Sequence, residues 1–71
     1  MTDSIDVPNE DLHDALDIVD EMGYSRNVKD YWQASISFST IWFEGLTGYE
    51  VVDILHEFED NGIDANLSLP F

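Results

Sequence analysis

The chain has 71 residues, and its 16 Asp and Glu face only two Lys and Arg, which gives a formal net charge of -14. This length corresponds to one domain with a thin hydrophobic core. The 44% hydrophobic and 13% aromatic content excludes a disordered acidic tail. The negative field excludes direct binding to nucleic acid and to anionic membrane surfaces, and it favours cationic proteins as partners.

The first eight residues are interpreted as a short acidic lead-in that ends at Pro8. This end lacks the basic and apolar regions of a signal peptide. No apolar run approaches the roughly 18 residues of a membrane span. We therefore expect a cytoplasmic protein, with no membrane partner.

A first helix is predicted over residues 9–22. Asn9 is a suitable N-cap, and Gly23 is a suitable residue just beyond the C-terminus. The helix has one apolar stripe at helical spacing, formed by Leu12, Ala15, Leu16, Val19 and Met22. After a turn-like segment over residues 24–30, the residues 31–43 are rich in aromatic and β-branched types and predict a strand region, which is long enough to fold as two strands.

The predicted strand region alternates between two faces. One face carries Ile36, Phe38, Thr40 and Trp42, and the other carries Ser35, Ser37, Ser39 and Ile41. The second face turns apolar near Ile41 and Phe43, which predicts a bulge or burial of both faces there. Trp32, Trp42 and Phe43 are expected in the core, although a partly exposed Trp beside an acidic face would also suit an interface anchor.

A second helix is predicted to begin at a capping box, in which Thr47 and Glu50 exchange side-chain and backbone hydrogen bonds. Its apolar face is Val51, Ile54, Leu55 and Phe58, and Asn61 with Gly62 ends it. A final strand follows, where Ile63, Ala65, Leu67 and Leu69 alternate with polar residues up to Pro70. The predicted fold is α+β: residues 1–71 form a single acidic domain with two helices on one face of a small, three-stranded, mostly antiparallel sheet.

The carboxylates gather in two rows at helical spacing, opposite the apolar stripes. Their predicted role is partner binding, and they are Glu10, Asp11, Asp14, Asp17 and Glu21 on the first helix and Glu50, Asp53, Glu57 and Asp60 on the second. Like charges at i,i+4 destabilise a helix by about 0.2–0.5 kcal/mol each. Neither row contains a Lys or Arg, so stability alone does not explain them. A solvated charged face is the ordinary alternative.

Motifs for chemistry are absent from the sequence. The chain has no Cys, no G-x-S-x-G turn and no Gly-rich phosphate loop. His13 with Asp17 and His56 with Asp60 are interpreted as surface pairs rather than metal ligands. We therefore expect no enzyme, no catalytic residues, no metal, no cofactor and no small-molecule substrate.

In its size, its charge of -14, its lack of Cys and its two acidic helical rows, the chain resembles the small acidic inhibitors of phages and mobile elements. These proteins imitate the DNA phosphate backbone, and they include anti-CRISPR proteins; the resemblance implies one of these, with the type I-C class suspected, acting in the cytoplasm of a bacterial host cell. The resemblance implies that a positively charged nucleic-acid-binding protein, such as a Cascade-type CRISPR effector complex, is blocked at its DNA-binding groove. The family shares a strategy rather than a motif, so no residue role follows from it.

Two other interpretations of the acidity remain open. The chain is alternatively an immunity protein or antitoxin that plugs the basic active site of a nuclease or toxin, in which case a few carboxylates would dominate binding. As a third alternative, the acidity is an adaptation to a high-salt cytoplasm and is unrelated to function. The dependence of folding on salt separates this last alternative from the other two.

Overall fold

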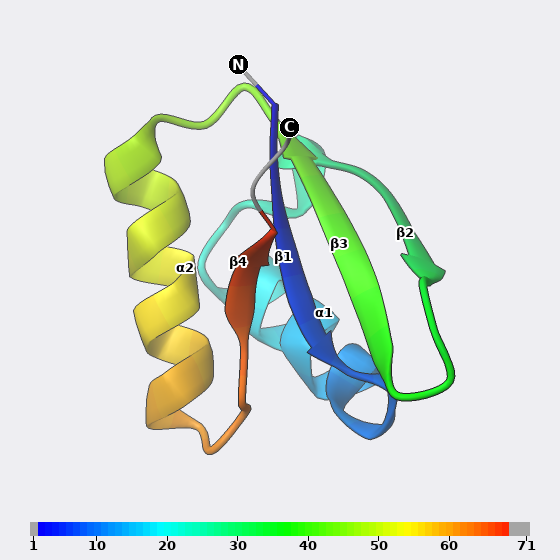
Figure 1. Cartoon of the computed structure of the whole chain (residues 1–71). Helices are drawn as coiled ribbons and strands as arrows, with labels where there is room; N and C mark the ends of the chain where they lie inside the picture. Colours follow the sequence, from blue (N-terminus) through cyan, green and yellow to red (C-terminus); the bar gives the residue numbers. More distant parts are fainter. Residues whose placement is uncertain (1, 69–71) are drawn as a thin grey trace.

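The chain folds as one antiparallel sheet with two α-helices packed against it. The computed structural model describes residues 2–68. Four strands, β1 (Thr2–Pro8), β2 (Val28–Gln33), β3 (Phe38–Glu44) and β4 (Asn66–Ser68), lie in the order β2-β3-β1-β4. Figure 1 shows the helix α1 (Leu12–Glu21) behind this sheet and α2 (Gly48–Asp60) beside β4. The predicted α+β class is confirmed, and the sheet has four strands rather than three.

The additional strand is the segment that we interpreted as a lead-in, and that interpretation was wrong. β1 is a central strand, which pairs with β3 from Thr2 to Pro8 on one side and with β4 on the other. Ile5 and Val7 are buried within it. Alternation of these two side chains with Ser4 and Asp6 is the pattern of a half-buried strand, but two apolar residues among acids give only a weak signal.

The first helix begins later than predicted, because residues 9–11 form a 3-10 turn, η1 (Asn9–Asp11). Asn9 makes no capping hydrogen bond and instead contacts the loop between β2 and β3. The predicted N-cap role is therefore wrong. The C-terminal prediction is confirmed, since Gly23 follows the helix with a φ of 86°, a left-handed conformation that glycine adopts without a steric penalty.

The aromatic region folds as a hairpin of β2 and β3, one of the two predicted possibilities. A bulge was one of two expectations near Ile41 and Phe43; the register shift lies instead in the partner strand β2, between Val28 and Asp30, opposite Phe43 and Trp42. The sequence left open which face of β3 is buried: Ser39, Ile41 and Phe43 are buried on the core side, and Thr40 of the other face is also buried. Trp32, expected in the core, is 44% exposed, and Trp42 is half-buried.

The second helix agrees closely with its prediction. The Thr47 N–H donates to Glu50 Oε1 at 2.9 Å, and the Glu50 N–H donates to Thr47 Oγ1 at 3.2 Å, so both halves of the capping box are present. α2 ends before Asn61 and Gly62, as predicted. In the final predicted strand, Ile63 and Ala65 are buried but only the segment from Asn66 to Ser68 is paired. Leu69 and Pro70 lie outside the described residues.

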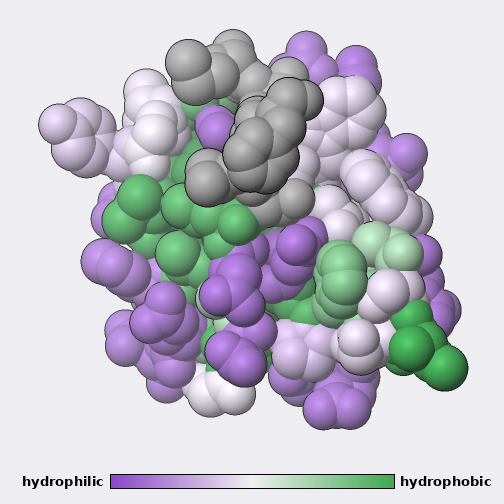
Figure 2. Space-filling model, viewed as in Figure 1, coloured by the Kyte–Doolittle hydropathy of each residue, from purple (hydrophilic) through white to green (hydrophobic). Residues whose placement is uncertain are grey.

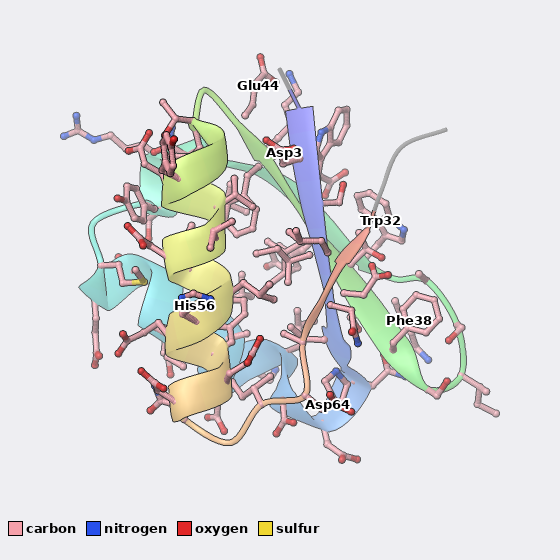
Figure 3. The ribbon with its side chains drawn as sticks, turned by 60° about the vertical axis from the view of Figure 1, so that its left-hand side comes forward. Asp3, Trp32, Phe38, Glu44, His56 and Asp64 are labelled. Atoms are coloured by element: carbon pink, nitrogen blue, oxygen red, sulfur yellow. The ribbon has the colours of Figure 1, made fainter. Side chains whose placement is uncertain are left out.

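A single core joins one face of the sheet to both helices. Its buried apolar side chains are Ile5, Val7, Ala15, Val19, Ile41, Phe43, Leu46, Val51, Ile54, Phe58, Ile63 and Ala65. Within residues 2–68, no helix is both long enough and apolar enough to cross a membrane. The other face of the sheet is not covered by either helix, and Figure 3 shows Trp32 and Phe38 on that side, away from α2.

Candidate functional site

The acidic row of the first helix surrounds one shallow hollow. Asp14, Asp17 and Glu21 are exposed on α1 and line it together with the half-buried Asp11 of η1. The opposite wall is formed by Asn61 and Ile63, just beyond α2, and the hollow encloses about 250 Å³. Glu10 is exposed in the same turn but does not line this hollow. The structure therefore brings four of the five predicted carboxylates of this row together.

The second predicted row divides into two kinds of carboxylate. Asp53, Glu57 and Asp60 are exposed on α2, while Val51, Ile54 and Phe58 on the same helix are buried. Glu50 is half-buried and serves as part of the capping box. Hydrogen bonds from the Thr47 backbone and hydroxyl, together with the nearby Tyr24 hydroxyl, lower the pKa of Glu50. Glu50 thus stabilises the helix start as well as adding negative charge.

Part of the second row lies near Tyr24, which follows α1. Partial burial raises the pKa of Tyr24, and the nearby negative charges of Glu50 and Asp53 raise it further. The N-terminal part of α2 therefore lies near the C-terminal end of α1, while Asn61 at the other end of α2 lies near the α1 carboxylates. Figure 3 shows α1 crossing obliquely behind α2, and both acidic rows belong to the same helical layer.

Basic side chains do not neutralise these rows. Among residues 2–68 the one ion pair joins Lys29 Nζ to Glu44 Oε2 at 3.1 Å, at the far end of the β2–β3 hairpin. Arg26 lies in the same region, where it lines a small hollow with Lys29 and Glu44. None of the nine predicted carboxylates takes part in an ion pair within the described part of the chain.

The uncovered face of the sheet is aromatic, a feature that our sequence analysis did not assign. The Trp32 and Trp42 rings meet edge to face, with centroids 6.4 Å apart, and Lys29 Nζ lies 5.9 Å from the Trp42 centroid. Phe38 continues this row and is 37% exposed. Figure 2 shows a mixture of pale and green surface on the side of β2 and β3, and hydrophilic surface over the lower half of α2.

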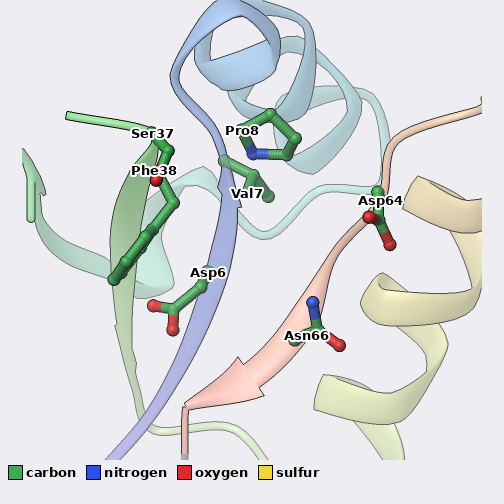
Figure 4. A pocket seen from close by; sticks show the side chains of 7 residues that line it. All are labelled: Asp6, Val7, Pro8, Ser37, Phe38, Asp64 and Asn66. Carbon is green, nitrogen blue, oxygen red and sulfur yellow. The ribbon is translucent and has the colours of Figure 1, made fainter. Parts of the chain in front are cut away.

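A second hollow opens at the Phe38 end of this face, where β4 no longer pairs with β1. It encloses about 370 Å³ and is lined by Asp6, Val7, Pro8, Ser37, Phe38, Asp64 and Asn66. Figure 4 shows Phe38 and Asp6 on one side of β1 and Asp64 and Asn66 on the other. The Thr40 hydroxyl donates to Asp6 Oδ1 at 2.7 Å and holds that carboxylate in place.

Asp6, Asp64 and Phe38 were not among the predicted site residues. Asp6 and Phe38 come together because Pro8 of β1 is paired with Phe38 of β3, with Asp6 opposite Thr40. The sequence analysis could not predict this pairing, because it interpreted residues 1–8 as a lead-in rather than as a strand. The apolar-polar alternation from Ser4 to Val7 is the signal that points to a strand and hence to this side of the sheet.

Comparison with known proteins finds no matching family model, no similar curated protein and no similar solved structure.

Proposed function

We propose that the protein is an inhibitor that imitates DNA and occupies a positively charged DNA-binding surface of another protein. The observation that carries this proposal is the helical layer of exposed carboxylates without a basic partner in the described residues. Both helices supply them, and the surface is hollowed beside the α1 row. The resemblance to anti-CRISPR proteins makes a Cascade-type CRISPR effector complex the first partner to test.

The spacing of the charges supports the same function. Carboxylates three or four residues apart on a helix are separated by about 5 Å along its axis. Phosphates of duplex DNA follow each other at about 3.4 Å per strand. A groove whose Lys and Arg side chains contact successive phosphates would therefore meet a similar density of charge on α1 and α2. Binding would release counterions from both partners and weaken as salt rises.

The test measures target-DNA binding by a purified type I-C Cascade complex while this protein is added in increasing amounts. In a mobility-shift assay, the protein is expected to displace duplex DNA, and the displacement is expected to weaken steeply between about 50 and 200 mM salt. Inhibition that is the same at both salt concentrations would contradict an electrostatic mimic. DNA binding that stays unchanged when the protein is added at low salt would also contradict the proposal.

A charge-matched pair of variants tests whether the two rows carry the inhibition. The first variant combines Asp14→Asn, Asp17→Asn, Asp53→Asn and Glu57→Gln. The control combines Asp3→Asn, Asp20→Asn, Asp30→Asn and Glu59→Gln, and removes four charges outside the rows. Each lost carboxylate would remove one exposed ion pair with the partner, which contributes about 0.5 kcal/mol. The loss of four such pairs predicts that the first variant inhibits about 30-fold more weakly. An equal loss for both variants would show that net charge, rather than the rows, is responsible.

A further inference from the structure

We propose that the hollow at the Phe38 end of the open sheet face is a socket for one arginine side chain of a basic protein partner. This inference rests on the proposed function, because it assumes a cationic protein that approaches this molecule. It adds a specific contact on a part of the surface that is separate from the two acidic rows. The socket is defined by Asp6, Pro8, Phe38, Asp64 and Asn66.

The walls of the socket match the chemistry of arginine. Phe38 and Pro8 supply apolar surface for the side-chain methylenes, and an aromatic ring attracts a planar guanidinium over its face. Asp6 and Asp64 supply carboxylates on the two sides of β1 (Figure 4). A guanidinium has five N–H donors in a rigid fork that matches the two oxygens of one carboxylate, here Asp6 beside Phe38, whereas lysine presents a compact charge.

The aromatic row already holds a cation at its other end. Lys29 Nζ lies 5.9 Å from the centroid of Trp42, and Trp42 contacts Trp32 edge to face. Lys29 also pairs with Glu44 at 3.1 Å, so an aromatic ring and a carboxylate share one cation there. Phe38 with Asp6 and Asp64 presents the same combination of groups at the opposite end of β3, with no base of residues 2–68 lining the hollow.

The occupant must come from another molecule of opposite charge. Arg26 and Lys29 both line the hollow at the Glu44 end of β3, so neither base of this chain reaches the socket. A second copy is a poor occupant, because each chain carries a net charge of -14 and two copies repel. A basic partner is attracted by that same charge. Because Arg26 and Lys29 lie at the Glu44 end of β3, the partner is expected to approach the Phe38 end.

The socket is continuous with the surface assigned to binding. Ile63 and Asn61 form one wall of the hollow lined by the α1 carboxylates, and Asp64, the next residue, lines the socket. A partner that covers the α1 row therefore reaches the socket around this short segment. The acidic rows attract a basic partner without a strong directional preference. Binding of one arginine in the socket would fix the partner's orientation.

The experiment uses the full-length, ¹⁵N-labelled protein and two capped tripeptide amides, Gly-Arg-Gly and Gly-Lys-Gly, followed by NMR at low salt. The arginine peptide is expected to shift the amide signals of Asp6, Phe38, Asp64 and Asn66. Asp6→Asn is expected to weaken that binding about tenfold, as for the loss of one hydrogen bond to a charged group, and Asp64→Asn, across β1, is expected to weaken it less. The Asn at position 6 retains an acceptor for Thr40, so the local structure is kept.

Asp53→Asn is the matched control, because it removes one charge on α2 and leaves the socket unaltered. Its effect on arginine-peptide binding is expected to stay below about twofold, as for an exposed charge outside the contact. Equal binding of the lysine peptide at the same signals would overturn the assignment to a guanidinium. Shifts confined to α1 and α2 would overturn the socket and leave the proposed DNA mimicry intact. Socket binding by a protein that does not displace DNA from Cascade would instead refute the proposed function.

Discussion

Asn9 is the residue whose role differs most from its expected one, and it joins three parts of the fold. Its Nδ2 donates to the carbonyl oxygens of Ser35 and Ile36 at 3.2 and 2.9 Å, and its Oδ1 accepts from the Ser39 hydroxyl at 2.6 Å. Its backbone N–H donates to the Ser37 carbonyl at 3.2 Å. These contacts hold the β2–β3 loop against the end of β1, beside the proposed socket.

Asn9→Ala is expected to lower the free energy of unfolding by about 1–3 kcal/mol, because it leaves the buried Ser39 hydroxyl without its acceptor. The measurement is urea denaturation followed by tryptophan fluorescence. Asn9→Ala combined with Ser39→Ala is expected to cost less than the sum of the two single changes, since both partners are then removed. Strictly additive losses would show that the Asn9–Ser39 hydrogen bond contributes nothing of its own.

At the scale of elements, the start of α2 depends on the capping box and should be sensitive to acid. Hydrogen bonding from Thr47 lowers the pKa of Glu50, so the ionised carboxylate stabilises the folded state. This contribution is fully present above the ordinary pKa of Glu, about 4.3, and is lost as the pH falls through the lowered value. Glu50→Gln should remove that part of the acid dependence, as measured by urea denaturation at a series of pH values. An unchanged pH profile in the variant would exclude the mechanism.

Elements with local signals were predictable, and those that depend on long-range pairing were not. The Thr47–Glu50 box and the residues Asn61 and Gly62 set the bounds of α2 through contacts within a few residues, so the sequence predicts them directly. β1 was missed because its identity as a strand depends on pairing with β3, more than 30 positions away at Asp6 and Thr40. For the same reason the sequence did not predict which face of β3 is buried, nor the socket beside Phe38.

The acidic rows of the candidate site were predictable because they follow from helical periodicity alone. Asp14, Asp17 and Glu21 are exposed on α1, and Asp53 and Glu57 are exposed on α2, each at the helical position that the spacing indicates. The capping-box motif also predicts that Glu50 accepts a backbone N–H, as the structure confirms. Helical periodicity does not reveal how the two helices lie relative to each other, which tertiary packing decides.

At the scale of the whole molecule, charge and apolar surface are arranged unevenly. Carboxylates cover the helical layer, the aromatic row covers the opposite face of the sheet, and both bases lie at the Glu44 end of β3. The core that separates the two layers joins side chains from β1, β3 and both helices. A basic partner would therefore approach the Phe38 end, where the α1 row and the proposed socket meet, and would be repelled from the other end.

The concentration of negative charge should make the stability of the whole fold depend on salt. Repulsion acts over about 30 Å at 10 mM ionic strength and about 8 Å at 150 mM. The variant with four neutralised row positions, Asp14, Asp17, Asp53 and Glu57, loses several like-charge contacts of about 0.2–0.5 kcal/mol each. Its unfolding temperature at low salt is therefore expected to exceed that of the parent by about 4–8 °C, for a gain near 1 kcal/mol.

Thermal unfolding followed by circular dichroism at about 10 and 150 mM salt measures this difference under both screening conditions. The parent is expected to be folded at low salt and to gain stability as salt rises, and the four-position variant is expected to gain less. A parent that folds only in molar salt would instead favour adaptation to a saline cytoplasm. A variant less stable than its parent would show that these carboxylates stabilise the fold, which would remove the reason for assigning them to a partner.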